Sequence, residues 1–501
     1  MSFLGIDVGT TGCKTCVFRE DGALIASAYR EYDVRVSQPG YAELDARAVW
    51  RELKDCIAQV SAASGRDPIA ALAVSSLGEA TVPVSRERHI LGPSLLNFDE
   101  RGVEFLDELG RRLDDGRLYR INGNTLGNHY GLTKLLWWKQ HQPDIWDRAH
   151  KFLLWGSFVS YMLGADPVVD YSLANRTLLF DLDARDWSGE LLAWSGIDPD
   201  KLPGAAPSGT VIGQVAKPLA DELGLPATVA IVTGGHDQCC NATGAGVLGR
   251  GDALLGMGTF LCAAPVFECR RDPEAMLPHG LNTEHHAVPG RFITFMYNQA
   301  GCLLKWYRDT FAAAEHRAAQ EAGEDVYPRL LAEMPDAPAS VIVLPHFTTT
   351  GPPEFISDSS GVMVGLRLET RRGEILRGIL EGSVFYLREC LERARTADIE
   401  VTRFSAVGGG SKSDAWLQLT ADILQTPLSR PIQTEAGALG AAMLAAVATR
   451  AFDSLEQAVA AMAAPGRAFE PRPVASARYE PHYERYTQLW PLMKDYLRSK
   501  P

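Results

Sequence analysis

The sequence predicts a mixed α/β protein made of two similar domains. Its 501 residues are more than one hydrophobic core normally holds. Apolar strand-like runs alternate with helical patterns along the chain, which indicates sheets covered by helices. A strand–turn–strand pattern near the start, residues 3–18, returns at residues 251–265. Such a recurrence, at about half the length of the chain, is expected of two related domains.

The first third of the chain shows how strands and helices alternate. Residues 3–28 predict three successive strands joined by short turns. The apolar spacing in ARAVWRELKDCIAQVSAA, residues 46–63, predicts an amphipathic helix, and IAALAVSS, residues 69–76, predicts a buried strand. Residues 131–164 predict two helices interrupted near Pro143.

Composition and charge restrict the class of protein. With 46% hydrophobic and 22% charged residues, the chain is typical of a globular protein. No apolar run is long enough to span a membrane, and the first hairpin begins at once, which leaves no room for a cleaved signal peptide. The formal net charge of −13 argues against a nucleic-acid partner.

The cysteines favour a reducing compartment. There are nine of them, an odd number, spread over apolar or strand-like runs. Cys13 and Cys16 have the CxxC spacing, but residues three apart on a strand face opposite sides, so we expect neither a shared metal nor a disulfide. We therefore expect a cytoplasmic protein.

The first hairpin, GIDVGTTGCKTCVF, combines a carboxylate, hydroxyls and a cation. A strand ends at Asp7, a glycine-rich turn follows with Thr10 and Thr11, and Lys14 lies on the returning strand. Backbone N–H groups and threonine hydroxyls in such a turn can surround phosphate oxygens, and a lysine adds charge. No GK[ST] opens a helix here, so this is not a Walker loop. Taken alone, the stretch also fits a tight hairpin without a ligand.

Three later stretches add to this interpretation. GDALLGMGTFLCAAP repeats the hairpin with Gly258 and Thr259 in its turn, and two facing hairpins would form a clamp. In RFSAVGGGSKSDAWLQLTADIL, three glycines between a strand and a helix allow a phosphate or a flat ligand to approach the backbone, although a tight turn is the alternative. In TVAIVTGGHDQ, Asp237 follows a strand and begins a helix, either as an N-cap or as a carboxylate at the ligand-binding end of a sheet.

These elements, in this order, resemble the FGGY family of carbohydrate kinases nearly end to end. Other matching fragments are PGYAELDARAVW, TKLLWWKQHQPDIW, VVDYSLANRTLLFDLDARDWS, LPGAAPSGTVIG, AGCLLKWYRD and EAGALGAAML. The resemblance implies two ribonuclease-H-like domains of the actin-like ATPase fold, with a ligand cleft between them. It implies an N-terminal sugar-binding domain, residues 1–245, and a C-terminal ATP-binding domain, residues 246–501.

The resemblance also implies roles for individual residues and two cofactors, ATP and Mg²⁺. Asp237 matches the catalytic base, and Asp7, with Asp237, matches the carboxylates near the metal. The phosphate and nucleotide contacts match Thr10, Thr11, Lys14, Gly258, Thr259, Gly301, Gly409, Gly410 and Asp414. In the related glycerol kinases the position of Asp414 carries Asn; an Asp there can still accept a hydrogen bond from the adenine amino group.

The resemblance places the sugar contacts in the N-terminal half, and two departures from the family patterns argue against glycerol and leave D-xylulose open. The candidates are Glu79, Asp99, Arg101, His129 and Gln238. Glycerol kinases have Arg directly before the matching Glu, whereas this chain has Gly78, and the Gln-Met-His-Gly stretch of xylulose kinases is absent. A ketopentose such as xylulose or ribulose, a related sugar or a tetritol-type polyol remains open. So does a capping or surface role for each of these side chains.

Two other functions remain open at this point. An actin-like ATPase switch would share the hairpins and the glycine-rich turn, but it would not need GGHDQ beside a polar cleft. A catalytically silent sugar sensor would bind sugar without forming a phosphorylated product. The sequence leaves the oligomeric state open, a homo-oligomer included.

Overall fold

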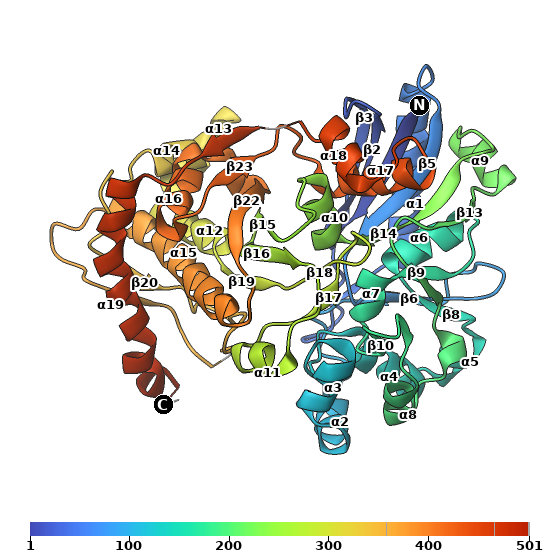
Figure 1. Ribbon diagram of the computed structural model, residues 1–501, viewed down its shortest axis with the longest axis horizontal. Coiled ribbons are helices and arrows are strands. Elements are labelled where there is room, and N and C mark those ends of the chain that lie inside the picture. Colours follow the sequence, from blue (N-terminus) through green and yellow to red (C-terminus); the bar gives the residue numbers. More distant parts are fainter. Residues whose placement is uncertain (357, 465, 499–501) are drawn as a thin grey trace.

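The computed structural model describes residues 1–356, 358–464 and 466–498 (Figure 1). Residues 357, 465 and 499–501, which the predicted C-terminal domain includes, lie outside the described residues. The described chain forms two main sheets, one in each half of the sequence, with helices on their faces (Figure 1).

The N-terminal sheet has six strands in the order β13-β14-β5-β1-β2-β3. β1 runs antiparallel to β2 and parallel to β5; β5 runs parallel to β14, and β13 lies antiparallel at the edge. The strands are β1 (Ser2–Val8), β2 (Gly12–Arg19), β3 (Leu24–Glu31), β5 (Ile69–Ser76), β13 (Val211–Gln214) and β14 (Ala230–His236).

The C-terminal sheet repeats this topology. β15 runs antiparallel to β16 and parallel to β22; β22 runs parallel to β23, and β24 lies antiparallel at the edge. Beyond β16 the sheet continues into β17 (Glu284–His285), β18 (Phe292–Ile293) and β19 (Met296–Gln299). The strands that repeat are β15 (Gly251–Met257), β16 (Phe260–Phe267), β22 (Val401–Val407), β23 (Leu428–Arg430) and β24 (Arg467–Phe469). The predicted recurrence of the hairpin is therefore part of a repeated sheet.

Two helices occupy the space between the sheets, α10 (Asp237–Gly244) and α17 (Ala436–Ala448) (Figure 1). α17 comes from the C-terminal half but packs on β1 and β5 of the N-terminal sheet. The contact is close: a Cβ atom at Gly5 would lie 1.8 Å from the carbonyl oxygen of Ala438, so only glycine fits there. The core cluster around α17 contains strand residues of both sheets, which joins the two halves.

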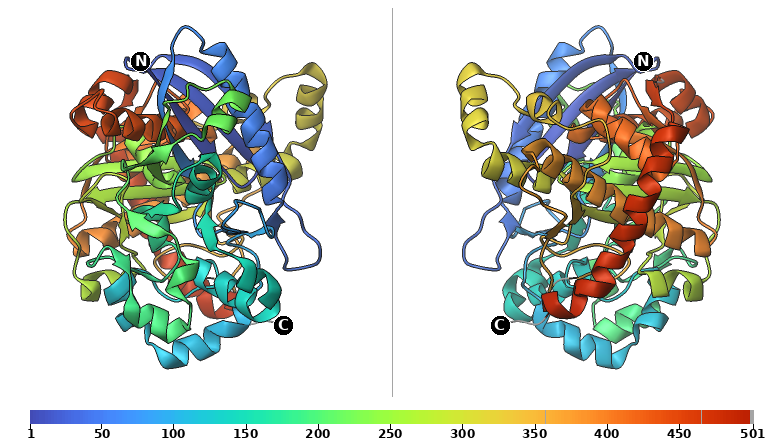
Figure 2. Two further views of the ribbon diagram at one scale, coloured as in Figure 1. Left: turned by 90° about the vertical axis from the view of Figure 1, so that its right-hand side faces the viewer. Right: turned by 90° about the vertical axis from the view of Figure 1, so that its left-hand side faces the viewer.

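The other helices cover the outer faces. α1 (Ala46–Ala63) and α6 (Trp155–Leu163) pack on the N-terminal sheet, and α18 (Leu455–Met462) follows α17. α15 (Arg372–Thr396) and α19 (Pro473–Arg498) cover the C-terminal half, with α19 along its outer side (Figure 2). The shorter helices are α2 (Leu106–Arg112), α3 (Asp115–Asn122), α4 (Gly131–His141), α5 (Pro143–Arg148), α7 (Tyr171–Asn175), α8 (Gly189–Ser195), α9 (Lys217–Leu223), α11 (Pro273–Met276), α12 (Gly301–Phe311), α13 (Ala313–Ala322), α14 (Tyr327–Leu331) and α16 (Asp414–Leu424).

The prediction for residues 131–164 was wrong in part. Between α5 and α6 the chain forms β8 (Lys151–Leu154), which pairs with β6 (Thr81–Val84). The apolar run in this stretch does not distinguish a buried strand from a buried helix, and tertiary pairing decides. Four further two-stranded sheets are present among the described residues. They pair β4 (Glu43–Leu44) with β7 (Ser94–Leu95), β9 (Val168–Asp170) with β12 (Gly204–Ala206), β10 (Phe180–Asp181) with β11 (Asp186–Trp187), and β20 (Ile342–Leu344) with β21 (Val362–Val364).

A segment of the C-terminal half also packs on the N-terminal half. The Tyr119 hydroxyl of α3 donates a 2.8 Å hydrogen bond to the carbonyl oxygen of Leu281. A Cβ atom at Gly123 would lie 2.1 Å from the carbonyl oxygen of Thr283, so this contact also requires glycine. The residues just before β17 therefore lie against the N-terminal half of the molecule.

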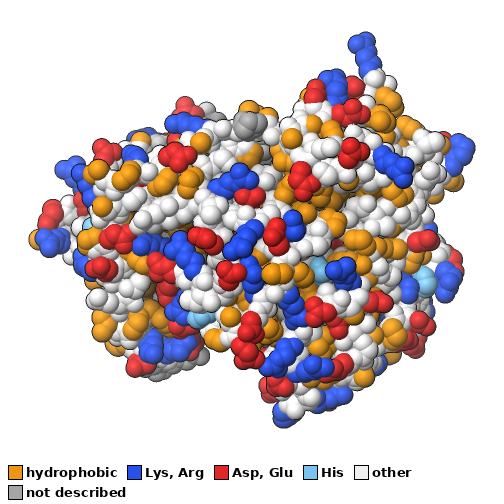
Figure 3. All heavy atoms as spheres, viewed as in Figure 1, with side chains coloured by type: hydrophobic (Ala, Val, Ile, Leu, Met, Phe, Trp, Pro, Cys, Tyr) orange, Lys and Arg blue, Asp and Glu red, His pale blue; other side chains and the backbone are white. Residues whose placement is uncertain are grey.

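Surface and cysteine features agree with the composition. Among the described residues, no helix has both the length and the apolar character needed to cross a membrane. Side chains of both charges are interspersed over the face shown in Figure 3. All nine cysteines are free, and Cys13 and Cys16 belong to different core clusters, as expected from their opposite directions on β2.

Candidate active site

A cavity of about 650 Å³ brings together residues of both halves of the chain. The turn after β1 contributes Thr10, and the turn after β15 contributes Gly258 and Thr259. Asp237 and Gln238, at the start of α10, also line it. Of the predicted sugar contacts, Glu79 and His129 line the same cavity as Gln238. The two hairpin turns and Asp237 thus lie around one space.

Asp237 is positioned by an irregular strand end. The register of β14 against β5 shifts between Val232 and Gly235, and a Cβ atom at Gly234 would lie 1.9 Å from the carbonyl oxygen of Val74. The strand then passes directly into α10, whose cap residue His236 makes no side-chain capping bond. The N-cap position thus belongs to His236, and Asp237 is the first residue of the helix.

The environment of Asp237 suits proton transfer. Burial raises the pKa of its carboxyl group to about 7, and the nearby Asp7 carboxylate adds to the increase. The side chain nevertheless keeps 29% of its surface exposed, which leaves it accessible from the cavity. His236 Nε2 lies 3.2 Å from Asp237 Oδ1. Burial holds the pKa of His236 well below its usual value, so this ring is neutral at pH 7.

Asp7 lies on β1 beside the start of α17. The Ser75 hydroxyl of β5 donates a 2.6 Å hydrogen bond to Asp7 Oδ1. A Cβ atom at Gly437 would lie 3.3 Å from the carboxyl carbon of Asp7, so the N-terminus of α17 directly adjoins it. Burial raises the pKa of Asp7, whereas Ser75 and Lys14 lower it. The start of a helix favours a negative charge at this position.

Lys14 does not line the cavity. Its Nζ lies 2.6 Å from Glu435 Oε2, at the cap position of α17. Thr11, next to Thr10 in the turn, is exposed. Of the three residues predicted for the first phosphate turn, Thr10 alone is part of the described lining.

The second turn rests on the N-terminus of α12. The backbone N–H of Cys302 donates a 3.1 Å hydrogen bond to the carbonyl oxygen of Thr259. A Cβ atom at Gly301 would lie 2.2 Å from the carbonyl oxygen of Gly258. Gly301, predicted as a nucleotide contact, therefore has a packing reason to be glycine.

The predicted adenosine region follows β22. Gly408 has a φ of +91°, which favours glycine, and Gly409 and Gly410 begin a short 3₁₀ helix before α16. Asp414 opens α16, and both of its carboxylate oxygens contact arginines: Oδ1 lies 2.8 Å from Arg430 Nη1, and Oδ2 contacts Arg467. Each oxygen of Asp414 thus already pairs with an arginine. These residues do not line the cavity around Asp237.

Asp99 and Arg101, predicted as sugar contacts, lie behind the cavity wall. Arg101 Nη2 lies 2.6 Å from Asp99 Oδ2 and 2.8 Å from Glu43 Oε2, and Asp99 also accepts a 2.6 Å hydrogen bond from the N–H of Ala42. Both side chains are buried because they neutralise each other. Their neighbours Asn97 and Phe98 line the cavity instead.

Arg176, His236 and Asn282 are among the polar lining residues that the sequence analysis missed. Arg176 lies just after α7, within a fragment that carries the family resemblance, but no spacing in that fragment marks a ligand-facing side chain. Asn282 belongs to the segment that crosses from the C-terminal half, and this crossing depends on tertiary packing. His236 stands next to Asp237 and could have been found from that position.

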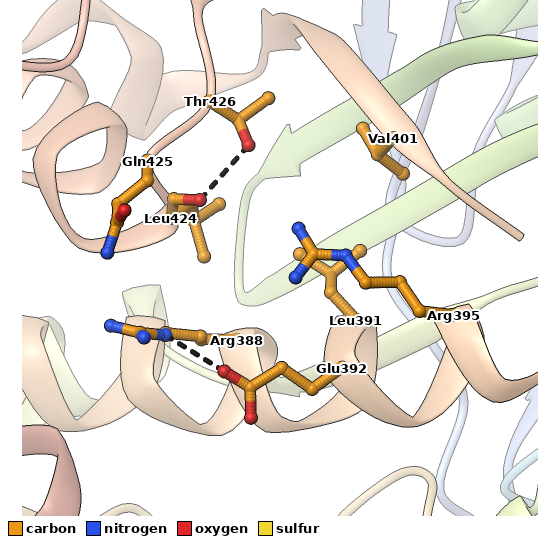
Figure 4. Close-up of a pocket in the computed structure, with 8 residues that line it drawn as sticks. All are labelled: Arg388, Leu391, Glu392, Arg395, Val401, Leu424, Gln425 and Thr426. Atoms are coloured by element: carbon orange, nitrogen blue, oxygen red, sulfur yellow. Dashed lines mark hydrogen bonds and ion pairs between the residues drawn. The ribbon is translucent and has the colours of Figure 1, made fainter.

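A smaller cavity of about 100 Å³ lies elsewhere, at α15 (Figure 4). Arg388, Glu392 and Arg395 of α15 face the stretch after α16, where the Thr426 hydroxyl donates to the carbonyl oxygen of Leu424 (Figure 4). Arg388 is held by Glu392 and by Glu480 of α19. This cavity contains none of the predicted site residues, and its ion pairs fasten α19 to α15.

Comparisons with known proteins give the family. The model described as "FGGY family of carbohydrate kinases, N-terminal domain" matches residues 2–244, and the corresponding C-terminal model matches residues 271–449. The chain is 27% identical to the xylulose kinase of Bacillus subtilis over 98% of this chain and 97% of that protein. It is 24% identical to the gluconokinase of the same organism over 90% and 88%.

Solved structures agree with the fold. A crystal structure of a xyloylose kinase from Brucella ovis superposes with a TM-score of 0.88 and 27% identity, over 99% of this chain and 100% of that chain. The two repeated sheets, the helices between them and this likeness identify the actin-like ATPase fold. Together with the two family models, which account for most of the chain, they show that it belongs to the FGGY family of carbohydrate kinases and is an ATP-dependent enzyme of that family.

Proposed function

We propose that this kinase transfers the γ-phosphoryl group of ATP to a hydroxyl of a small sugar or polyol, with Asp237 as the general base. The observation that supports the proposal is the single cavity in which Asp237 faces both hairpin turns. Phosphoryl transfer depends mainly on positioning and on stabilisation of charge, and two turns around one carboxylate supply both.

In the proposed step, the acceptor oxygen forms a bond to the γ-phosphorus while the bond to the β–γ bridging oxygen breaks. The hydroxyl proton passes to the Asp237 carboxylate, and ADP leaves. An alcohol becomes acidic only as its oxygen bonds to phosphorus, so the base acts in the transition state. A carboxyl pKa of about 7, well above the usual value of about 3.9, makes Asp237 a stronger base than an ordinary aspartate.

Asp7 and Asp237 fit a role in holding Mg²⁺. Both are carboxylates, and each is desolvated enough for its pKa to be raised, so a cation would stabilise their charged forms. Among the described residues, no cluster of three or more metal-binding side chains is present. That pattern suits Mg²⁺, which takes one or two carboxylates and completes its shell with water and phosphate oxygens. When bound, the ion would neutralise phosphate charge.

The acceptor is proposed to be a ketopentose such as xylulose or ribulose, or a related sugar. Relatives named xylulose kinase support this choice. We also propose that the sugar site belongs to residues 1–245 and most of the ATP site to residues 246–501; the N-terminal family model ends at residue 244 and the C-terminal model begins at residue 271. The nine free cysteines support a cytoplasmic location.

The test is ADP formation with ATP and Mg²⁺ across ketopentoses, aldoses, tetritols, pentitols and glycerol. We expect one strong responder, with the phosphorylated hydroxyl located by mass spectrometry and NMR. ATP hydrolysis that proceeds equally without any acceptor would contradict the proposal and favour an ATPase switch. Sugar binding without phosphorylated product would favour a silent sensor.

A further inference from the structure

Arg176 is the one cationic side chain among the described residues that line the cavity. All three of its nitrogens are engaged by glutamates. Nε lies 2.6 Å from Glu79 Oε1, Nη2 contacts the same oxygen, and Nη1 lies 2.5 Å from Glu284 Oε1. Three of the five N–H donors of the guanidinium are therefore taken by glutamates, and its positive charge faces two carboxyl groups of the protein.

The two glutamates are held rigidly. Glu284, on β17, is fully buried, and its Oε1 also accepts a 2.6 Å hydrogen bond from Asn282 Nδ2. Glu79 has a φ of +62°, a left-handed conformation that is costly for a glutamate, and its side chain is 5% exposed. The Tyr130 ring lies 5.1 Å from the guanidinium carbon on another side. The cluster is thus part of the wall, with little freedom to rearrange for a ligand.

No other lining side chain supplies positive charge. The described lining holds no lysine and no second arginine, and burial lowers the pKa of His129 to about 4, so that ring is neutral at pH 7. Asp237 adds a carboxylate to the same wall. The carboxyl groups around the sugar region belong to Glu79, Asp237 and Glu284, and the one described cation there is Arg176. Whether or not Glu284 is protonated, the negative charges at least equal the positive one.

We propose that this pocket selects uncharged sugars and polyols over sugar acids, and that Glu79 and Glu284 set this selection by occupying Arg176. The proposal rests on the proposed kinase function and names the substrate class within it. It chooses between an uncharged and an acidic acceptor, a choice that the relatives leave open because they include both a xylulose kinase and a gluconokinase. An acid would place its carboxylate against like charges, with no unpaired cationic side chain of the described lining to compensate.

The first experiment compares pairs that differ only at one end, as alditol and aldonate: xylitol with xylonate, ribitol with ribonate, threitol with threonate and glucitol with gluconate. D-Xylulose and D-ribulose complete the uncharged set. We expect an uncharged compound to give the highest kcat/KM and its acid counterpart to be at least about 100-fold poorer, as like-charge contacts of several kcal/mol imply. An acid as the best acceptor would overturn the proposal.

The second experiment changes the charge of the cluster. Glu284→Gln and, separately, Glu79→Gln should raise the acid-to-neutral ratio of kcat/KM at least about tenfold, because each releases part of the guanidinium. Glu190→Gln removes a glutamate from an exposed pair with Arg117 and is the matched control. Its ratio should equal that of the parent. An unchanged ratio in both cluster variants, with the fold intact by circular dichroism, would overturn the role of the glutamates.

Binding separates this proposal from the proposed kinase function. Isothermal titration of the same pairs, without nucleotide, needs no turnover. Uncharged compounds that bind more tightly than their acids, with no phosphorylation of either, would support the charge selection and contradict the kinase proposal. Acids that bind as tightly as their uncharged partners, or the absence of any binding by the uncharged set, would overturn the charge selection.

Discussion

The two hairpins at the cavity have the same topology, but the first carries a charged pair of residues where the second carries an uncharged pair. In the first, Asp7 on β1 pairs with Lys14 on β2; in the second, Gly256 takes the corresponding place on β15 and pairs with Cys262. Each lies one residue before the end of its strand. The first hairpin therefore carries an acid and a base at a position where the second carries no charge.

The surroundings of the two turns differ in the same way. Polar partners hold the first hairpin: Ser75 bonds Asp7, and Glu435 bonds Lys14. Backbone packing holds the second, because Gly301 brings α12 directly against Gly258. The difference teaches that a repeated fold can divide its work; under the proposed mechanism, metal and proton chemistry would lie beside the first hairpin and backbone donors at the second.

The largest expected effect follows from Asp237, the carboxylate between the two turns. Asp237→Asn should lower kcat by about 10³-fold, within the usual contribution of a general base, while ATP and sugar binding change little. Asp221→Asn, at an exposed pair with Lys217, is the control and should keep the parent rate. Steady-state kinetics and ligand titration measure both. Turnover at the parent rate in Asp237→Asn would refute the assignment of the base.

The next effect tests the asymmetry directly. Asp7→Asn should lower kcat/KM by about 10²-fold and raise the Mg²⁺ concentration needed for half-maximal rate, because a carboxylate beside the metal is lost. Gly256→Ala, at the matching position, should change the rate by less than about threefold, since its nearest contacts would lie at 3.7 Å. Similar losses in the two variants would show that the hairpins share the work equally.

The pH dependence of kcat/KM should reflect the ionisation of Asp237 and the effect of Asp7 on it. Asp237 accepts a proton only when ionised, and its pKa is about 7 because of burial and then the charge of Asp7. The ionised fraction, and with it kcat/KM, should fall about tenfold for each pH unit below 7 and reach a plateau above it. In Asp7→Asn, one cause of the raised pKa is gone, so the decline should move to lower pH. Rates measured from pH 5.5 to 8.5 decide; a decline that stays in place would remove Asp7 as a cause.

The sequence predicted the repeated hairpin, the strand before Asp237 and the helix after it, because these depend on local glycine placement and apolar spacing. It did not predict that Arg176 and Glu284 meet, since they are 108 residues apart and come together only when the segment before β17 crosses to the other half. Nor did it separate Asp99 and Arg101 from the lining. A charged pair two residues apart has the same pattern whether it faces a ligand or closes on itself.

A smaller effect is expected from changes to the packing of the two turns. Gly301→Ala would place a Cβ atom 2.2 Å from the carbonyl oxygen of Gly258, so the second turn must move, with a loss of about 1–3 kcal/mol in the free energy of unfolding and a raised KM for ATP. Gly9→Ala in the first turn would place a Cβ atom 3.2 Å from the carbonyl oxygen of Gly12, so its loss in the free energy of unfolding should be smaller. Urea unfolding and ATP kinetics test the pair. Equal costs would show that the first turn is packed as tightly as the second.

The smallest effect concerns Lys14, and it decides what the cation of the first hairpin does. If Lys14 moves from Glu435 to the phosphates when ATP binds, Lys14→Met should raise KM for ATP about tenfold, the value of one charge-assisted contact. Glu435→Gln should leave that KM near the parent value, because the lysine is then freer to move. If Lys14 only stabilises the fold through its ion pair, Lys14→Met and Glu435→Gln should change KM for ATP by the same small amount, as expected for a partly exposed ion pair. The double variant should then be no worse than either single variant. We expect the first pattern. Lys14 lies in the same hairpin as the phosphate turn, and its ion pair with Glu435 at the cap of α17 keeps it near that turn although it does not line the cavity.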